Sequence, residues 1–192
     1  MRITFPKGRK IMKLLIASDI HGDLESMELV LRAFESEGAD KMLLLGDLLY
    51  HGPRNDLPKT YAPKAVIELL NANKDNILAV RGNCDTEVDQ MVLKFPILAD
   101  YAYLSLDGLA VFATHGHNHN TENQPPISKG DILLHGHTHV LKCLEFGNQN
   151  YYLNPGSAAL PKENNPRTYM VYENRTFTVK DFDKNIVLEK KF

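Results

Sequence analysis

The sequence predicts an α/β protein in which two β-sheets face each other and helices cover the outside. The first observation is that the first half of the chain alternates short apolar runs with one-sided helical patterns. The second is that the other half is rich in strand patterns separated by turn residues. With 192 residues and no internal repeat or linker, the chain can build one sizeable core. Residues 12–192 are therefore predicted to form a single domain.

The first half of the chain begins with a short apolar run at residues 14–17, which predicts a buried parallel strand. A helix is expected over residues 24–37, because its apolar residues recur on one stripe. Asp23 can cap the start of this helix and Gly38 can end it. The next strand is expected at residues 42–45, which completes a β-α-β unit.

A loop rich in Pro, Gly and Asn follows at residues 48–63, and long loops in compact domains are often functional. Pro63 is suited to the first position of a second helix. A third strand is predicted at residues 77–80. A short helix over residues 86–94 then ends before Pro96.

The second half of the chain is predicted to consist mainly of strands. These are expected at residues 101–106, 109–113, 132–134, 142–146, 151–153, 168–172 and 176–181. Asp107-Gly108 between two apolar runs predicts a tight hairpin. Asn174-Arg175 predicts a second hairpin near the end of the chain.

The composition excludes several classes of protein. An apolar fraction of 43%, a charged fraction of 24% and a net charge of -2 are ordinary for a globular protein. There is no strong nucleic-acid signal. No apolar run is long enough to span a bilayer, so no membrane partner is expected.

The start of the chain and the cysteines bear on the compartment. Residues 1–11 carry four basic side chains without a following apolar stretch, so they do not resemble a signal peptide. Regular structure begins directly after Met12, a second candidate start, so residues 1–11 are expected to be an extension without fixed structure. Two cysteines, Cys84 and Cys143, make no disulfide framework. We expect a cytoplasmic protein.

Three histidines lie close together directly after the predicted strand at residues 132–134. On an extended backbone, residues i and i+2 point to the same side, so His137 and His139 can present two imidazoles to one place. Taken alone, this stretch is also compatible with a histidine cluster on the surface. Other apolar runs, however, also end in polar residues that can bind a metal.

Seven candidate metal ligands each lie just past the end of an apolar run: Asp19, His21, Asp47, Asn83, His115, His137 and His139. Ligands of α/β sheets bind outside the carboxyl ends of the strands, so separate strands can bring these side chains together. Carboxylate, imidazole and amide donors suit Mn, Fe, Zn, Co or Ni. Seven ligands exceed the need of one ion. Two divalent metal ions per chain, sharing Asp47 as a bridge, account for the number.

The motifs in which these residues occur resemble a known superfamily. They are Asp19-Ile20-His21, Gly46-Asp47, Gly82-Asn83-Cys84-Asp85, His115-Gly116-His117 and Gly136-His137-Thr138-His139. In this order they resemble the calcineurin-like metallophosphoesterases over residues 12–157, and the short chain is most similar to the bacterial YfcE-type phosphodiesterases. The resemblance implies an α/β fold with a β-sandwich of two mixed sheets flanked by helices, in four layers of the order α/β/β/α.

The resemblance also assigns the ligands and the reaction. Asp19, His21 and His139 would hold the first metal, and Asn83, His115 and His137 the second, with Asp47 bridging them. Manganese is the first expectation for both ions, with Fe, Zn, Co and Ni as alternatives. The implied reaction is hydrolysis of a small-molecule phosphodiester by a hydroxide that bridges the metals, with Asp47, Asn83 and Cys84 as catalytic residues.

Cys84 departs from the family pattern, which usually has a histidine directly after the asparagine of the third motif. That histidine is thought to contact the phosphate and protonate the leaving oxygen, whereas a thiol is a poorer hydrogen-bond donor. The alternative is a buried, inert thiol. Without the histidine, the enzyme is expected to favour good leaving groups or to use another donor, His117 or His51.

Three further residues are predicted to bind substrate. Arg54 and His51 lie in the Gly-Pro loop and His117 in the fourth motif; the alternative for Arg54 is an exposed, solvated side chain. Asp85 is expected to orient Asn83 or a metal-bound water.

Other functions remain open on the sequence. A phosphomonoesterase or a dinucleoside-polyphosphate hydrolase could use the same site, and a protein-binding scaffold of similar fold is a third alternative. A homo-oligomer is compatible with exposed apolar residues expected at Phe95, Pro96 and Ile97.

Overall fold

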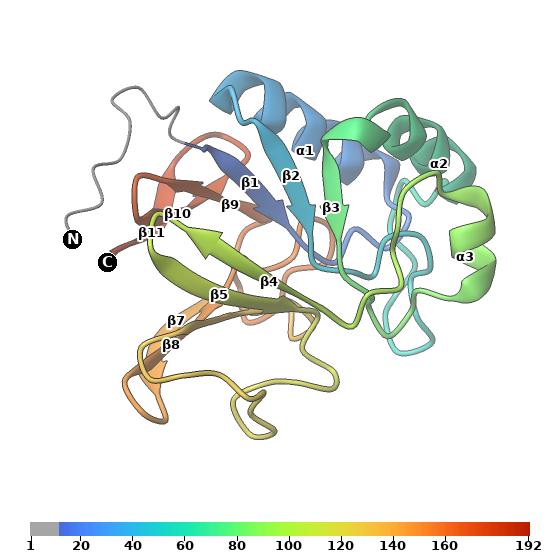
Figure 1. Cartoon of the computed structure of the whole chain (residues 1–192). Coiled ribbons are helices and arrows are strands. Elements are labelled where there is room, and N and C mark those ends of the chain that lie inside the picture. Colours follow the sequence, from blue (N-terminus) through green and yellow to red (C-terminus); the bar gives the residue numbers. More distant parts are fainter. Residues whose placement is uncertain (1–11) are drawn as a thin grey trace.

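Two mixed β-sheets face each other in the computed structural model, which describes residues 12–192 (Figure 1). The two-sheet fold predicted from the sequence is thus confirmed. The predicted extension at residues 1–11 lies outside the described residues.

The first sheet has six strands in the order β11-β10-β9-β1-β2-β3. They are β1 (Leu14–Ala17), β2 (Lys41–Leu44), β3 (Ile77–Ala79), β9 (Thr168–Glu173), β10 (Thr176–Asp181) and β11 (Ile186–Lys191). β2 pairs with β1 and with β3 in parallel, whereas β9 pairs with β1 antiparallel. The parallel half directs the carboxyl ends of β1, β2 and β3 to one edge.

The second sheet has five strands in the order β4-β5-β6-β8-β7. They are β4 (Tyr101–Leu106), β5 (Leu109–Thr114), β6 (Ile132–Leu134), β7 (Lys142–Phe146) and β8 (Asn150–Asn154). β5, β6 and β8 are parallel, and the antiparallel strands β4 and β7 form its edges. The carboxyl ends of β5 and β6 therefore also point one way.

The helices are α1 (Leu24–Glu37), α2 (Pro63–Ala72), α3 (Glu87–Val92) and a 3-10 turn (Lys74–Asn76). α1 has the predicted bounds because the Asp23 carboxylate accepts the amide of Ser26 at 3.1 Å and Gly38 ends the helix at φ 63°. α1 and α2 share one apolar core with β1 and β2, on the outer face of the six-stranded sheet.

The four-layer description differs from the structure in one respect. Figure 1 shows α1, α2 and α3 on the side of the six-stranded sheet, and the chain between β5 and β6 beyond the other sheet is a loop. Within residues 12–192, no helix covers the five-stranded sheet. His119 of this loop instead packs against Phe112 of β5, with ring centroids 5.6 Å apart.

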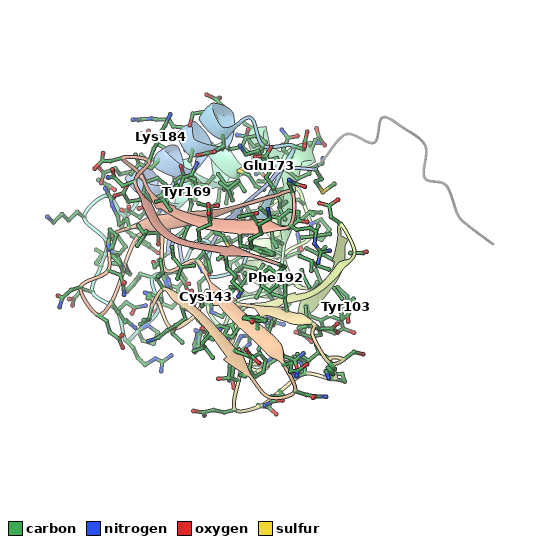
Figure 2. The ribbon with its side chains drawn as sticks, turned by 90° about the vertical axis from the view of Figure 1, so that its left-hand side faces the viewer. Tyr103, Cys143, Tyr169, Glu173, Lys184 and Phe192 are labelled. Atoms are coloured by element: carbon green, nitrogen blue, oxygen red, sulfur yellow. The ribbon has the colours of Figure 1, made fainter. Side chains whose placement is uncertain are left out.

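A second apolar core fills the space between the sheets. Leu14 and Ile16 of β1 meet Val111 of β5 and Leu134 of β6 there, and all four are almost fully buried. Figure 2 shows the same layer with the sheets seen from another side, with Phe192 and Cys143 labelled between them. The packing on both faces fixes β1, the strand that carries the first motif.

Several element predictions need correction. β2 and β3 each end one residue earlier than predicted, and β11 was not predicted at all. Phe95 and Ile97 are not exposed, because they pack into the core beneath α1 and α2; only Pro96 of the expected apolar patch is exposed. Among the described helices, none has the length and apolar character that a membrane span requires.

Candidate metal centre

The seven predicted ligands come from loops that follow five strands. Asp19 and His21 follow β1, Asp47 follows β2 and Asn83 follows β3. From the second sheet, His115 directly follows β5, and His137 and His139 follow β6. The two sheets thus contribute ligands to the same edge of the sandwich.

Asp19, His21 and His139 form a first group of donors, which we call the inner half-site. His21 Nε2 lies 3.2 Å from His139 Nε2, and Asp19 Oδ1 lies 3.3 Å from His139 Nε2. All three side chains are almost completely buried. Their donor atoms lie within 4.8 Å of one another, close enough to bind one ion.

Asn83, His115 and His137 form a second group, which we call the outer half-site. His115 Nε2 lies 3.0 Å from Asn83 Oδ1 and 3.2 Å from His137 Nδ1. His115 is buried, but His137 is half-buried and Asn83 is exposed. This group therefore faces the surface more than the inner half-site does.

Asp47 lies between the two half-sites. Its Oδ2 is 3.7 Å from His21 Nε2 on one side and 3.4 Å from His115 Nε2 on the other. The structure thus brings all seven predicted ligands together and puts the predicted bridging carboxylate in the middle.

Two hydrogen bonds to the backbone orient the imidazoles of the inner half-site. Nδ1 of His21 donates to the carbonyl of Tyr50 at 2.8 Å, and Nδ1 of His139 donates to that of Leu160 at 2.6 Å. In the neutral rings, both Nε2 atoms then carry lone pairs that face each other. Asp19 Oδ1 is also buried there without a hydrogen-bond partner. Facing acceptors without a donor are unfavourable alone, so this donor set fits a cation.

The backbone is strained where the ligands lie. Five of the seven adopt left-handed conformations that non-glycine residues rarely use: Asp19 (φ 59°), His21 (φ 51°), Asp47 (φ 54°), His137 (φ 66°) and His139 (φ 61°). Each such residue costs about 1–3 kcal/mol and persists where the surrounding structure enforces it, mostly at functional sites.

Asp85 connects two of the loops that carry the candidate ligands. Its carboxylate accepts the backbone amides of Asp47 at 2.8 Å, Leu48 at 2.9 Å and Gly82 at 2.7 Å. No bond from Asp85 to the Asn83 side chain is present among the described residues. Asp85 therefore joins the loops after β2 and β3. Gly82 permits this approach, because a Cβ there would collide with the backbone and carboxylate of Asp47.

The electrostatics of the cluster differ from one imidazole to the next. Burial opposes the charge on His115, but Asp47 and Asp19 raise its pKa to about 9. Burial and the neighbouring His115 lower the pKa of His137 to about 4. Burial would raise the pKa of Asp47, yet His115 holds it below its ordinary value.

Cys84 sits beside the centre rather than in it. Its amide donates to Asp47 Oδ1 at 2.8 Å, and its Sγ accepts the Asn83 side-chain amide at 3.2 Å. The Sγ atom also lies within 4.8 Å of donor atoms of His21 and Asp47. Burial and the charge of Asp47 raise the pKa of the thiol well above its ordinary value. The thiol is therefore a very weak acid.

The predicted substrate-binding residues occupy three different places. Arg54 lines a cleft of about 260 Å³ together with Asp47, Asn83, His137 and His139, so it faces the centre. His117 lines a separate adjoining cavity, and its ring centroid is 5.4 Å from that of His115.

His51 does not line the cleft. Its ring packs edge-on against those of Tyr50 and Tyr61, with centroids 4.7 and 5.3 Å away.

Lys162 also lines the metal cleft but was not predicted from the sequence. It lies in the segment between β8 and β9, and its amide donates to the carbonyl of His139 at 3.1 Å. No motif marks this segment. The turn sequence Asn154-Pro155-Gly156-Ser157 just before this segment could have indicated that the chain approaches the site here. Ser157 Oγ donates to the carbonyl of Asp19 at 2.9 Å.

Comparisons with known proteins agree with this geometry. Residues 12–176 match the model of the calcineurin-like phosphoesterase superfamily domain. The chain is 47% identical to the phosphodiesterase YfcE of Escherichia coli (strain K12) over 88% of its length and 91% of that protein. It is 29% identical to the phosphodiesterase MJ0936 of Methanocaldococcus jannaschii, over 76% of this chain and 83% of that one.

Solved structures give the same picture. The E. coli YfcE phosphoesterase has a TM-score of 0.89 and 44% identity, covering 93% of this chain and 98% of that one. Vps29 of Entamoeba histolytica, solved with zinc, has a TM-score of 0.54 and 19% identity, covering 93% and 97%. The second likeness concerns the fold alone.

Proposed function

The chain belongs to the calcineurin-like phosphoesterase superfamily, and we propose that it is a metal-dependent phosphodiesterase that uses two divalent ions. The observation that carries this proposal is the meeting of seven donor side chains in two groups that share Asp47. Asp19, His21 and His139 would hold one ion, and Asn83, His115 and His137 the other. Manganese is the first candidate, and Fe, Zn, Co and Ni suit the same donors.

The protein's own residues explain how a phosphate ester would be held. When bound, the two ions would supply Lewis-acid activation of the phosphoryl group and a hydroxide nucleophile. Arg54 and Lys162 line the cleft over the centre, where their positive charges attract the phosphate. The backbone carbonyls behind His21, His115 and His139 keep the rings oriented throughout the reaction.

Leaving-group protonation is the weak point of this site. Cys84 occupies the position of the family histidine, but its thiol accepts a hydrogen bond from Asn83 and has a strongly raised pKa. We therefore assign no proton transfer to Cys84. Esters whose leaving group departs as a stable anion would be the preferred substrates.

The test is hydrolysis of bis(p-nitrophenyl) phosphate and of p-nitrophenyl phosphate, each with and without Mn. Metal-dependent turnover of the diester above that of the monoester supports the proposal. Preference for the monoester would identify a phosphomonoesterase instead. Cleavage of dinucleoside polyphosphates in preference to both would point to the corresponding hydrolase. Inactivity with every metal would favour a scaffold, a role for which seven competent donors serve no purpose.

The cellular setting is also a proposal. Both cysteines are free thiols, as expected in a reducing compartment such as the cytoplasm. Residues 12–192 would act as one domain. A homo-oligomer finds support in α3, where Val88 is 69% and Met91 84% exposed, although Phe95 and Ile97 are buried.

A further inference from the structure

A cavity of about 470 Å³ adjoins the metal centre on the side of the outer half-site. Its walls come from the loop after β5, from the segment after β6 and from β7 and β8. The volume lies in the range of about 300–1,000 Å³ typical of small-molecule sites. None of the proposed metal ligands except His137 lines it.

This cavity adjoins the metal cleft. His137 and Thr138 line both spaces, and the neighbouring residues Lys162 and Glu163 line one space each. A phosphate ester bound beneath Arg54 can therefore extend across Thr138 into the larger cavity. One elongated ligand could then occupy both spaces, with its phosphate at the metal centre.

The two ends differ in charge. The cleft over the metals carries the cations Arg54 and Lys162. The larger cavity carries Glu122 and Glu163, and the one lysine among its lining residues, Lys142, pairs with Glu163 at 3.8 Å. An anionic group thus suits the cleft, and a group without negative charge suits the cavity.

The lining also contains apolar surface. Val140, Leu144 and Tyr152 provide it, and Leu144 on β7 is 40% exposed. A ring can pack on these side chains while its hydroxyl or amino groups donate to Glu122 and Glu163. The chemistry of the cavity therefore fits a nucleoside or a sugar better than a simple alkyl group.

Cys84 lines a third space, on which the first cavity does not border. Together with Tyr50, Tyr61 and Val88 it lines a cavity of about 410 Å³ that has no lining residue in common with the first one. By the family resemblance, the residue at position 84 lies beside the leaving oxygen, which assigns the leaving group to that side. The substituent that stays on phosphorus belongs on the side of His137.

We propose that the cavity between His117, Leu144 and Glu163 binds the retained substituent of the diester, an uncharged or cationic, hydroxyl- or amine-bearing ring such as a nucleoside or a sugar. The proposal rests on the phosphodiesterase function. Hydrolysis breaks the bond from phosphorus to the leaving oxygen and forms one to the oxygen of water. The leaving group departs as its anion, and the retained group remains on a phosphate monoester in the cavity.

Three p-nitrophenyl diesters with the same leaving group test the proposal. Their retained groups are 5′-thymidyl, methyl and carboxyethyl. We expect kcat/KM for the thymidyl ester to exceed that of the methyl ester about 10-fold or more, with the gain mainly in KM. The carboxyethyl ester should fall below the methyl ester, because its carboxylate would face Glu122 and Glu163.

Two variants, with one control, test whether the preference for the thymidyl ester arises in this cavity. Leu144→Trp fills the cavity from a partly exposed position, so the thymidyl-to-methyl ratio of kcat/KM should fall about 5-fold or more toward one. The control Ile186→Trp changes a 61% exposed aliphatic residue on β11 of the other sheet and should leave the ratio unchanged. Replacing Glu122 and Glu163 together by Gln should raise the relative rate of the carboxyethyl ester.

Binding of the product thymidine 5′-monophosphate, measured calorimetrically on the metal-loaded protein, gives an independent readout. Leu144→Trp should weaken this binding and Ile186→Trp should not. Equal kcat/KM for the thymidyl and methyl esters, or a preference that survives Leu144→Trp, would overturn the proposal while leaving the phosphodiesterase function intact. If no diester is turned over with any metal, the function itself fails, and unchanged product binding in Leu144→Trp would then reject the cavity as well.

Discussion

The inner and outer half-sites consist of similar donors, yet they differ in how firmly the fold holds them. Asp19, His21 and His139 are at most 2% exposed, and all three have left-handed backbone. In the outer group, Asn83 is exposed and His137 half-buried, and only His137 has a positive φ.

The anchoring of the rings differs in the same way. Both imidazoles of the inner group donate to a backbone carbonyl, whereas in the outer group only His115 does, and His137 directs its Nδ1 at His115 instead. The core thus holds the inner half-site in a fixed geometry, whereas the outer half-site opens toward the cleft and the adjoining cavity. We expect the protein to retain the inner ion tightly and to exchange the outer ion with metal ions in solution.

The largest loss of activity should come from replacing Asp47, the residue that both half-sites share. Asp47→Asn replaces the bridging carboxylate by a neutral amide, which binds two cations poorly. Changes outside the first coordination shell already cost about 10–100-fold, so a loss of at least about 10²-fold in diester turnover is expected. Elemental analysis should find fewer ions per chain. A variant with two ions and near-normal turnover would show that Asp47 does not bridge.

The free energies of unfolding of metal-free His21→Ala and His137→Ala compare how much each half-site contributes to stability. Truncating a fully buried ring leaves a cavity and an unpaired carbonyl at Tyr50, so His21→Ala should cost about 2–4 kcal/mol. His137→Ala removes a half-buried ring without a carbonyl partner and should cost about 1 kcal/mol or less. Denaturant unfolding after chelation measures both. Equal costs would mean that the inner half-site is not the firmer one.

The number of protons released when metal binds should differ between the two half-sites, because their histidines differ in protonation. The pKa of His115 is raised to about 9 from the ordinary 6.5, so at pH 7 the metal-free ring keeps its proton. Burial lowers the pKa of His21, so the inner half-site binds its ion without displacing a proton from that ring.

Loading the outer ion at pH 7 should therefore release about one proton per chain, and the release should vanish as the pH rises through about 9. Calorimetry in buffers of different ionisation enthalpy measures it, with His115→Asn as the control. Release that accompanies the first ion only, or that persists above pH 10, would contradict this assignment.

The smallest loss of activity is expected from removing the thiol of Cys84, which lies beside both halves and belongs to neither. Cys84→Ala should change turnover of aryl diesters little, because the thiol delivers no proton. Cys84→His should raise turnover of esters with poor leaving groups, with a gain that grows with leaving-group pKa toward about 10²–10⁴-fold. A leaving-group series at constant metal content tests this. If Cys84→Ala abolishes aryl diester turnover, the thiol acts directly.

The sequence predicted those parts of the fold and site that depend on local signals. Asp23 and Gly38 mark the ends of α1, and Pro63 opens α2, because caps and φ restrictions act within a few residues. The seven candidate ligands could be singled out because each follows a strand whose end is marked by an apolar run.

Features that depend on distant contacts could not be predicted in the same way. Ile186, Val187 and Leu188 of β11 are consecutive apolar residues at an exposed sheet edge, so no alternation marks them as a strand. Phe95 and Ile97 are buried only because α1 and α2 cover them. Lys162 reaches the cleft because its segment is bonded to His139, a contact across 23 residues of chain that no local pattern encodes.

The most direct test of the two-half centre is a crystal of the protein grown with Mn and examined by anomalous scattering. We predict two peaks on either side of the Asp47 carboxylate, one among Asp19, His21 and His139 and one among Asn83, His115 and His137. In crystals transferred to chelator-buffered Mn, the outer peak should fade first. A single peak, an Asp47 carboxylate turned away from both positions, or loss of the inner ion first would contradict the structure's division into a firm and an open half.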